Sequence, residues 1–222
     1  MELYEVIKSR KSFRSFLPKK VDKEILERIL AASNRSPSYM NTQPWEVFVV
    51  TGEKKDSLVK KLLSQASSGA PPRPDVAFPQ EWPDAVDRRT REHKRLRLQA
   101  LGVDPNDKET LRSHFLLNFE FYGAPCVLFV GMEKVLTGWS MLDLGLFSSS
   151  ILFAARAEGL GCCPQALPMA YPDVIREELG ISPNIGLVLA ICMGYPDLKA
   201  HIHQYDTARR QLADFVKWYG FV

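Results

Sequence analysis

The sequence feature that most constrains the fold is a long apolar stretch from Met141 to Ala157. Asp143 and the run from Ser148 to Ser150 interrupt it, and Arg156 lies near its end. The apolar length falls short of the ~20 residues that a bilayer span needs. A helix that is apolar on nearly every side is usually buried by protein. We therefore expect a helix at residues 138–158, in the core or in a subunit interface, and no membrane association.

Helical and strand-like segments alternate around this stretch. Helical spacing or helix-boundary residues predict further helices at 2–9, 22–33, 54–66, 107–121 and from Tyr171 to Gly180. Runs rich in β-branched and aromatic residues predict strands at 46–51, 126–130 and 186–194. Glycines at 159–164 predict a turn-rich link. This alternation indicates a sheet covered by helices.

Residues 67–105 differ in character from the rest of the chain. Five prolines crowd the part that ends at Pro83, and the very basic run Asp87–Arg97 follows. We predict an inserted loop and a charged helix, because long insertions with little core signal are often lids or binding loops. The default for the basic run is a solvated helix face. The functional alternative is a lid whose arginines attract an anionic nicotinamide cofactor or a carboxylate-bearing substrate.

The end of the chain is unusually aromatic, with the sequence Phe215-Val-Lys-Trp-Tyr-Gly-Phe-Val. Chain termini are usually frayed and polar, and exposed aromatic side chains favour aggregation. The tail therefore either packs on its own domain or reaches a partner subunit, and the residues alone leave both possibilities open.

An anion-binding pattern lies near the N-terminus, in the sequence Arg10-Lys11-Ser12-Phe13-Arg14. In an extended segment, residues 10, 12 and 14 point the same way and present two guanidinium groups and a hydroxyl. Guanidinium forms bidentate, charge-assisted hydrogen bonds with phosphate. The alternative is that these residues are solvated surface cations.

A second polar segment runs from Ser36 to Trp45. Pro37 and Pro44 restrict its backbone, while Asn41 and Gln43 carry amides that both donate and accept. Such amides can hydrogen-bond the edge of a planar heterocycle. The alternative is a helix-to-strand loop that hydrogen-bonds to itself.

Together and in this order, the two segments resemble the FMN-dependent nitroreductase family. The resemblance extends to Gly159–Ala166, Tyr171–Gly180, Gly194–Asp197 and Thr207–Arg209, and only residues 67–105 match poorly. It implies one FMN-binding domain over residues 1–222, with an inserted lid at 67–105 and a dimer-docking tail at 198–222. The implied fold is α+β, a three-layer α-β-α sandwich with a mixed sheet, in an intertwined homodimer.

The resemblance also implies which residues hold FMN. The first group is expected at the phosphate and ribityl chain: Arg10, Lys11, Ser12, Phe13, Arg14 and Arg209. The second is expected to contact the flavin of the other subunit: Pro37, Ser38, Tyr39, Asn41 and Gln43. The third is expected beside the flavin ring, where a backbone N–H addresses N5: Pro164, Gln165 and Ala166.

The implied activity is that of an FMN-dependent NAD(P)H oxidoreductase. Hydride would pass from NADH or NADPH through flavin N5 to an electron-poor acceptor such as a nitroaromatic, a quinone or an activated alkene, with ping-pong kinetics. No catalytic side chain is expected, since the flavin does the chemistry.

Two alternatives to this activity stay open. A reductive dehalogenase or flavin-processing enzyme could share the fold, although the Arg-rich insertion offers no clear Glu, Tyr and Lys set for an iodotyrosine. A non-enzymatic basic module for anions or nucleic acid would leave the segment Ser36–Trp45 without a purpose.

The remaining signals favour a cytoplasmic protein without metal or nucleic acid. The net charge of +3 makes no case for nucleic acid. Four cysteines do not form a disulfide framework, and the first residues lack the layout of a signal peptide. We expect no redox role for Cys162-Cys163 and a solvated pair, not a metal site, at His201-Ile-His203.

Overall fold

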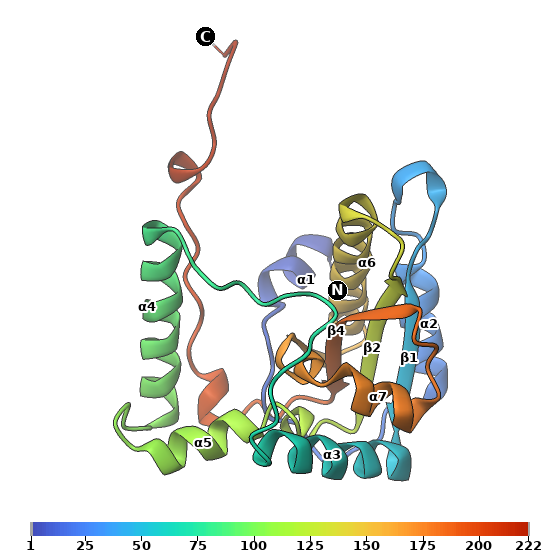
Figure 1. The fold of residues 1–222 in the computed structure, drawn as a ribbon. Coiled ribbons are helices and arrows are strands. Elements are labelled where there is room, and N and C mark those ends of the chain that lie inside the picture. The colour runs from blue at the N-terminus through green and yellow to red at the C-terminus, as the bar shows by residue number, and fades with distance from the viewer. Residues whose placement is uncertain (1, 222) are drawn as a thin grey trace.

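A four-stranded sheet with the order β1-β2-β4-β3 forms the centre of the structure, a computed structural model that describes residues 2–221 (Figure 1). Its strands are β1 (Glu46–Thr51), β2 (Cys126–Glu133), β3 (Gly161–Gln165) and β4 (Ile185–Gly194). All three ladders between these strands are antiparallel. The parallel component of the expected mixed sheet is confined to an isolated bridge between Ser12 and Cys162.

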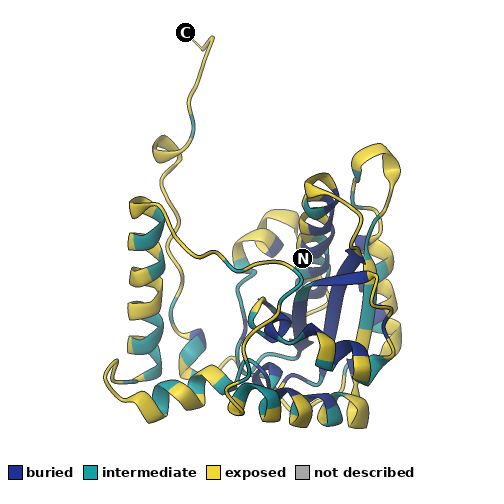
Figure 2. Cartoon of the chain, viewed as in Figure 1, coloured by how far each residue is buried: buried dark blue, intermediate teal, exposed yellow. Residues whose placement is uncertain are grey.

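Helices cover both faces of this sheet. Successive side chains of β2 point to opposite faces, so Phe129 packs in one core and Leu128 in the other. The first core is closed by α3 (Gly52–Ser67) and α7 (Pro172–Leu179), and the second by α2 (Lys23–Ser33) and α6 (Gly138–Ala157). The buried sheet between its helices is visible in Figure 2. This arrangement confirms the predicted three-layer sandwich.

Helix α6 is the predicted apolar helix. By length and composition alone it could cross a membrane, but its inner face packs Leu144, Phe147 and Ile151 into the core beside α2 and the sheet. Its outer face leaves Trp139 and Leu142 exposed, at 63% and 55%. The helix therefore belongs to the core along one side and presents an apolar surface on the other.

Two segments differ from their predictions. Residues 159–164, predicted as a turn-rich link, include most of β3. Gly161 serves a close approach there, because a Cβ at this position would lie 2.6 Å from the Phe13 ring. The helix predicted at 107–121 ends early, as α5 (Lys108–Leu116). The chain then turns through Phe121 and Tyr122, whose positive φ angles of 53° and 55° accompany their burial.

The inserted segment contacts the sandwich at Asp75, before the chain continues to the outlying helix. The Asp75 carboxylate accepts the Leu187 N–H at 2.8 Å, lies 3.3 Å from Lys134 Nζ and pairs with Arg176. Arg176 is itself buried and also donates to the Ile185 carbonyl. This anchor fixes the start of the chain that leads to α4 (Asp84–Leu101).

Helix α4 stands apart from the sheet, and the C-terminal tail runs beside it (Figure 1). None of the residues of α4 is fully buried, and the helix contacts the short 3-10 helix at His201–His203. Beyond this contact the tail extends away from the sandwich, leaving Phe215 and Trp218 exposed at 51% and 66%. The described aromatic end of the tail thus does not pack into its own core, and residue 222 of the predicted tail lies outside the described residues.

Candidate functional site

The N-terminal segment after α1 (Leu3–Ser9) is extended and lies along the edge strand β3. The Phe13 N–H donates to the Cys162 carbonyl at 2.9 Å, and farther along the Leu17 N–H donates to the Tyr195 carbonyl at 2.8 Å. The Phe13 side chain is buried in the core, 2% exposed. Because side chains alternate in an extended chain, burial of Phe13 turns its neighbours Ser12 and Arg14 to the other side.

These neighbours line a small hollow of about 160 Å³, which we call the cationic cavity. Four predicted residues of the N-terminal segment line it together with one predicted residue of the tail: Arg10, Lys11, Ser12, Arg14 and Arg209. Phe13 was also predicted to bind FMN, but it does not line the cavity. Its buried side chain supports the residues that do. The cavity is completed by five residues that the sequence analysis did not single out for binding: His93, Ile202, His203, Tyr205 and Thr207.

Positive charge is concentrated at this cavity. No carboxylate is among its described lining residues. Burial and then the charge of Arg209 lower the pKa of Arg10. Burial, followed by the charges of Arg14, Arg97 and Arg209, lowers the pKa of His93. Crowded cations of this kind are stabilised by an anion, so the cavity has the electrostatics of a phosphate site.

Unpartnered buried donors point to the same ligand. Among the described residues, Arg14 Nε and Tyr205 Oη are buried and have no hydrogen-bond partner, and the same is true of Arg97 Nε in α4. Buried polar groups are nearly always hydrogen-bonded, so these atoms indicate a missing acceptor. The cavity is smaller than the roughly 300–1,000 Å³ of ordinary ligand pockets. It therefore fits a phosphate and its chain, while a three-ring heterocycle must lie beyond it.

His203 lines the cationic cavity and supports Arg14, contrary to the prediction of a solvated histidine pair. The Arg14 N–H donates to its Nε2 at 2.8 Å, and its Nδ1 lies 2.8 Å from the Asp197 carbonyl. The neutral ring with a proton on Nδ1 satisfies both contacts. His203 is buried and burial lowers its pKa, whereas His201 is exposed. The described residues contain no cluster suited to a metal ion.

The segment from Ser36 to Trp45 lies elsewhere. It forms an exposed loop (light blue in Figure 1) far from α4, and none of its residues lines the cationic cavity of the described chain. The Tyr39 N–H donates to the Asp143 carboxylate of α6 at 3.1 Å. Within the loop, the Gln43 N–H donates to Ser38 Oγ at 3.0 Å and the Gln43 side chain donates to the Asn41 carbonyl at 3.1 Å. The loop is thus ordered by bonds within itself and by one carboxylate of α6.

Backbone strain is concentrated in this loop. Met40, Asn41 and Gln43 have φ angles of 49°, 58° and 46°. Such left-handed conformations are uncommon for residues other than glycine and tend to occur at binding sites. The loop therefore holds an unfavourable shape, and Pro37, Tyr39 and the amides of Asn41 and Gln43 are exposed.

The third predicted group lies at the end of β3. Pro164 lines a separate hollow of about 310 Å³ between α6 and β4. The Gln165 side chain is buried, where its Nε2 donates to the Asn118 carbonyl at 3.0 Å and its Oε1 has no partner. Ala166 is exposed. The neighbouring Cys162 is a buried free thiol whose pKa burial raises.

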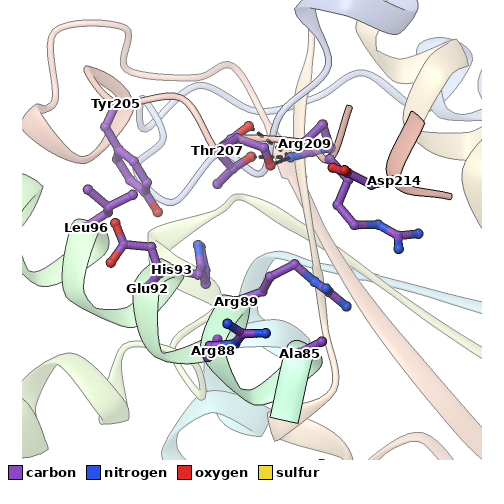
Figure 3. Close-up of a pocket in the computed structure, with 12 residues that line it drawn as sticks. Ala85, Arg88, Arg89, Glu92, His93, Leu96, Tyr205, Thr207, Arg209 and Asp214 are labelled. Atoms are coloured by element: carbon purple, nitrogen blue, oxygen red, sulfur yellow. Dashed lines mark hydrogen bonds between the residues drawn. The ribbon is translucent and has the colours of Figure 1, made fainter. Parts of the chain in front are cut away.

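A larger hollow of about 890 Å³ adjoins the cationic cavity, between α4 and the tail (Figure 3). We call it the arginine groove, because two arginines of α4 face two of the tail across it: Arg88, Arg89, Arg209 and Arg210. The two hollows share four lining residues: His93, Tyr205, Thr207 and Arg209. They are therefore neighbouring parts of one cationic surface.

The profile of the Nitroreductase family matches residues 7–195. The chain belongs to the nitroreductase family. The 4-nitrobenzoate reductase of Pseudomonas putida is 29% identical to it over 216 residues, 97% of this chain and 95% of the relative. Nitroreductase NfnB of Mycolicibacterium smegmatis is also 29% identical over 216 residues, 96% of this chain and 91% of the relative.

Solved nitroreductase structures extend the likeness to the whole chain. The FMN and NADPH-dependent nitroreductase NfnB from Sphigopyxis sp. strain HMH superposes with a TM-score of 0.97 at 27% identity, covering 100% of both chains. The FMN-dependent nitroreductase NfnB from Mycobacterium smegmatis, solved in complex with NADPH, gives 0.94 at 27% identity and covers 97% of each chain. These matches confirm the predicted family and fold, and they include the tail that the family profile does not reach.

Proposed function

We propose that this member of the nitroreductase family is an FMN-dependent NAD(P)H oxidoreductase that reduces electron-poor acceptors as a homodimer. The observation that carries the proposal is the cationic cavity, which gathers cations from two distant parts of the chain and contains buried donors without partners. Guanidinium groups bind phosphate through bidentate, charge-assisted hydrogen bonds. The solved relatives with which the chain superposes are described as FMN-dependent.

The residues of the cationic cavity would hold the phosphate and ribityl chain of FMN. Arg10, Ser12, Arg14 and Arg209 line the cavity and would face the phosphate, and Tyr205 Oη would add a neutral donor. Lys11 is less available, because its Nζ donates to the His203 carbonyl at 2.7 Å and lies 3.2 Å from Asp206. Arg209 Nη1 donates to Thr207 Oγ1 at 2.7 Å, which orients its guanidinium.

The ring of the flavin would lie outside the cavity, beside Pro164 and Ala166 and under the exposed loop of a second subunit. That loop offers Pro37, Ser38, Tyr39, Asn41 and Gln43, which cannot reach the cavity of their own chain. When bound, FMN would itself be the hydride carrier, accepting a hydride from NADH or NADPH at N5 and passing it to the acceptor. The protein's own contribution is to bind, to orient and to exclude water.

A homodimer would also cover apolar surface that the described chain leaves exposed. The outer face of α6 carries Trp139, Leu142 and Leu146, and the tail carries Trp218 and Phe221. Apolar surface of this extent on a soluble protein marks an interaction site. We place the aromatic end of the tail, which carries Trp218 and Phe221, on the second subunit.

The acceptors that fit this proposal are nitroaromatics, quinones or activated alkenes. Relatives of the chain are described as reductases of 4-nitrobenzoate and of chloronitrobenzene. If donor and acceptor use the same flavin face in turn, initial-rate plots at several acceptor concentrations give parallel lines. Intersecting lines would contradict this ping-pong order.

The dehalogenase alternative has a relative of its own, an iodotyrosine deiodinase from Thermotoga neapolitana that is 28% identical over 196 residues. The inserted segment 67–105 contains no tyrosine, which weakens the case for a Glu, Tyr and Lys set around an amino acid. Iodide release from iodotyrosine, compared with turnover of 4-nitrobenzoate, distinguishes the two activities.

The decisive test of the proposal is flavin retention. We expect the purified protein to be yellow with about one FMN per chain, and the variant Arg10→Ala with Arg209→Ala to lose it, since each charged hydrogen bond contributes about 1.5–3 kcal/mol. Absorbance of the gel-filtered protein measures the ratio. The control, Arg91→Ala with Lys94→Ala, removes two cations of α4 outside the cavity and should stay yellow. A wild-type protein that takes up no FMN contradicts the proposal.

A further inference from the structure

Four of the arginines of α4 form two pairs that differ in how their charge is balanced. Arg91 pairs with Asp87 at 2.5 Å and Arg95 pairs with Glu92 at 2.8 Å, and neither arginine lines the arginine groove. Arg88 and Arg89 do line it, and among the described residues neither forms an ion pair with a carboxylate. Two arginines outside the groove are therefore balanced by carboxylates of their own helix, whereas the two that line it are not.

The tail forms the opposite wall of the groove, and the two arginines that it contributes are also without a carboxylate partner among the described residues. Arg209 bonds only to Thr207 and the Ala208 carbonyl, and Arg210 lies 4.9 Å from the centre of the Phe215 ring. Neither is paired with a carboxylate within the described chain. Guanidinium groups on two elements therefore face the same space (Figure 3).

The acidic residues of the groove are already engaged. Glu92 accepts two hydrogen bonds from Arg95, both at 2.8 Å, and the Asp214 carboxylate accepts the Gln211 N–H at 3.0 Å. These are the two carboxylates among the described lining residues. The groove thus has a net positive charge that suits a multiply charged anion.

We propose that the arginine groove binds the 2′-phosphate of NADPH and makes the protein prefer NADPH to NADH. The proposal rests on the proposed function, because it assigns one end of the electron donor to a surface next to the flavin site. A phosphate monoester carries close to two negative charges near neutral pH, and guanidinium groups bind it bidentately. NADH has no such group at this end, so the groove would distinguish the two donors.

The position and exposure of the groove suit a donor that arrives and leaves in every cycle. It continues from the cationic cavity through His93, Tyr205, Thr207 and Arg209. The cavity contains buried donors, as a resident cofactor requires, whereas Arg88, Arg89 and Arg210 are exposed. At about 890 Å³ the groove has room for the adenosine end of a dinucleotide.

A carboxylate on the acceptor is the competing ligand for these arginines. A nitrobenzoate carries a single negative charge, for which one bidentate arginine is sufficient. It must also lie within one aromatic ring of the reacting flavin atom. The groove has three guanidinium groups that the cavity does not share, those of Arg88, Arg89 and Arg210. These exceed that need, so the phosphate is the better match.

The test compares Arg88→Ser with Arg89→Ser against Arg91→Ser with Lys94→Ser. Both variants remove two cations from α4, but only the first removes them from the groove. For the first we expect KM for NADPH to rise about 10- to 100-fold, with kcat and the KM for NADH nearly unchanged, because charged hydrogen bonds of ~1.5–3 kcal/mol are lost. The control should match the wild type.

A binding measurement without turnover keeps the two proposals separate. Calorimetry on the FMN-loaded protein should show adenosine 2′,5′-bisphosphate binding at least about 10-fold more tightly than adenosine 5′-monophosphate, and the first variant should lose this difference. Equal affinities in the wild type overturn the subsite while leaving the reductase intact. A selective rise in KM for 4-nitrobenzoate over nitrobenzene in that variant assigns the groove to the acceptor and also overturns it. A protein that reduces nothing but discriminates the two nucleotides keeps the subsite and rejects the reaction.

Discussion

The segments at residues 10–14 and 36–45 are both assigned to the cofactor, yet they are built in opposite ways. The first is held by its own chain: Phe13 is buried, and the Arg14 N–H donates to the buried His203. The second is an exposed loop with left-handed residues such as Met40, and it lines no part of the cationic cavity in the described chain. The first segment, which we call the first wall, is supported within its own chain. The second segment, the second wall, lines no part of its own chain's cavity, and our proposal assigns it to the site of a second subunit.

This difference shows which contacts hold the binding residues of each segment in position. The cationic cavity depends on packing around Phe13 and on contacts between segments far apart in the sequence, Arg14 and His203. The loop depends on Asp143 of α6 and on bonds within itself. Strain can persist there because those bonds over-determine its shape.

The largest expected effect tests whether the two walls act across subunits. We expect dimers of Arg10→Ala with Arg209→Ala, and dimers of Tyr39→Ala with Asn41→Ala, to be nearly inactive. In a two-fold dimer of one chain of each kind, one site receives both defects and the other receives none. Such mixed dimers, isolated with two affinity tags, should regain about half of the wild-type activity and flavin.

The matched control for this mixing experiment pairs two defects in the same wall. Mixed dimers of the variant Arg10→Ala with Arg209→Ala and the variant Arg14→Ala should regain nothing, because every site then receives a defective first wall. Absence of recovery in the main experiment would place both walls of a site on one chain. Recovery in the control would instead show that Arg14 and the pair Arg10 and Arg209 serve different sites of the dimer.

A smaller effect concerns pH and the way in which the first wall is supported. Burial, followed by the charges of Lys11 and Arg14, lowers the pKa of His203, and neutral His203 accepts the Arg14 N–H. A histidine whose folded-state pKa is depressed contributes stability that is present above its unfolded pKa, about 6.5. That stability is lost as the pH falls from about 6.5 towards the folded-state pKa.

We therefore expect the urea midpoint of the wild type to decrease between about pH 7 and pH 5. His203→Gln, which can still accept from Arg14 and donate to the Asp197 carbonyl, should flatten this decrease because it does not titrate. His201→Gln, at the exposed histidine two positions earlier, should retain it. Parallel pH profiles for the wild type and His203→Gln would remove His203 from this role.

The smallest effect measures the strain in the second wall. Met40 is exposed and has a φ of 49°. Because a left-handed conformation costs a non-glycine residue about 1 kcal/mol, Met40→Gly should raise the free energy of unfolding by up to about that amount. Thr42→Gly, at a right-handed helical φ of −71°, should instead lower it by about 0.5–1 kcal/mol. Chemical denaturation measures both, and equal changes would indicate that the loop is unstrained.

Much of the fold could be predicted from local sequence patterns. The apolar helix α6 and the strands β1, β2 and β4 follow from hydrophobicity and β-propensity. Helix α6 is buried along one side, β2 and β4 are buried on both faces along most of their length, and β1 is partly buried. Strand β3 could not be predicted in this way. Its Gly161 is required by the ring of Phe13, almost 150 residues earlier, and a contact of that kind leaves no local signal.

The residues of the candidate site also separate into those that the sequence predicts and those that only tertiary contacts reveal. Arg10, Ser12, Arg14 and Arg209 were predicted because their residue types and order match a family pattern. Other wall residues were missed, since His203 and Tyr205 are ordinary residues until the tail folds back beside the N-terminal segment. The basic run of α4 was recognised as a charged helix, but which of its arginines lack a carboxylate depends on which side meets the tail.

The sequence by itself determined the family, the apolar helix and the cationic residue types of the candidate cofactor site, because periodicity and short motifs depend on neighbours along the chain. Only the tertiary structure decided that Phe13 turns inward, that His203 supports Arg14, and that Arg88 and Arg89 face the tail without a carboxylate partner. These outcomes depend on distances between segments remote in sequence. Burial and charge acquire their energetic effect only when such segments come into contact.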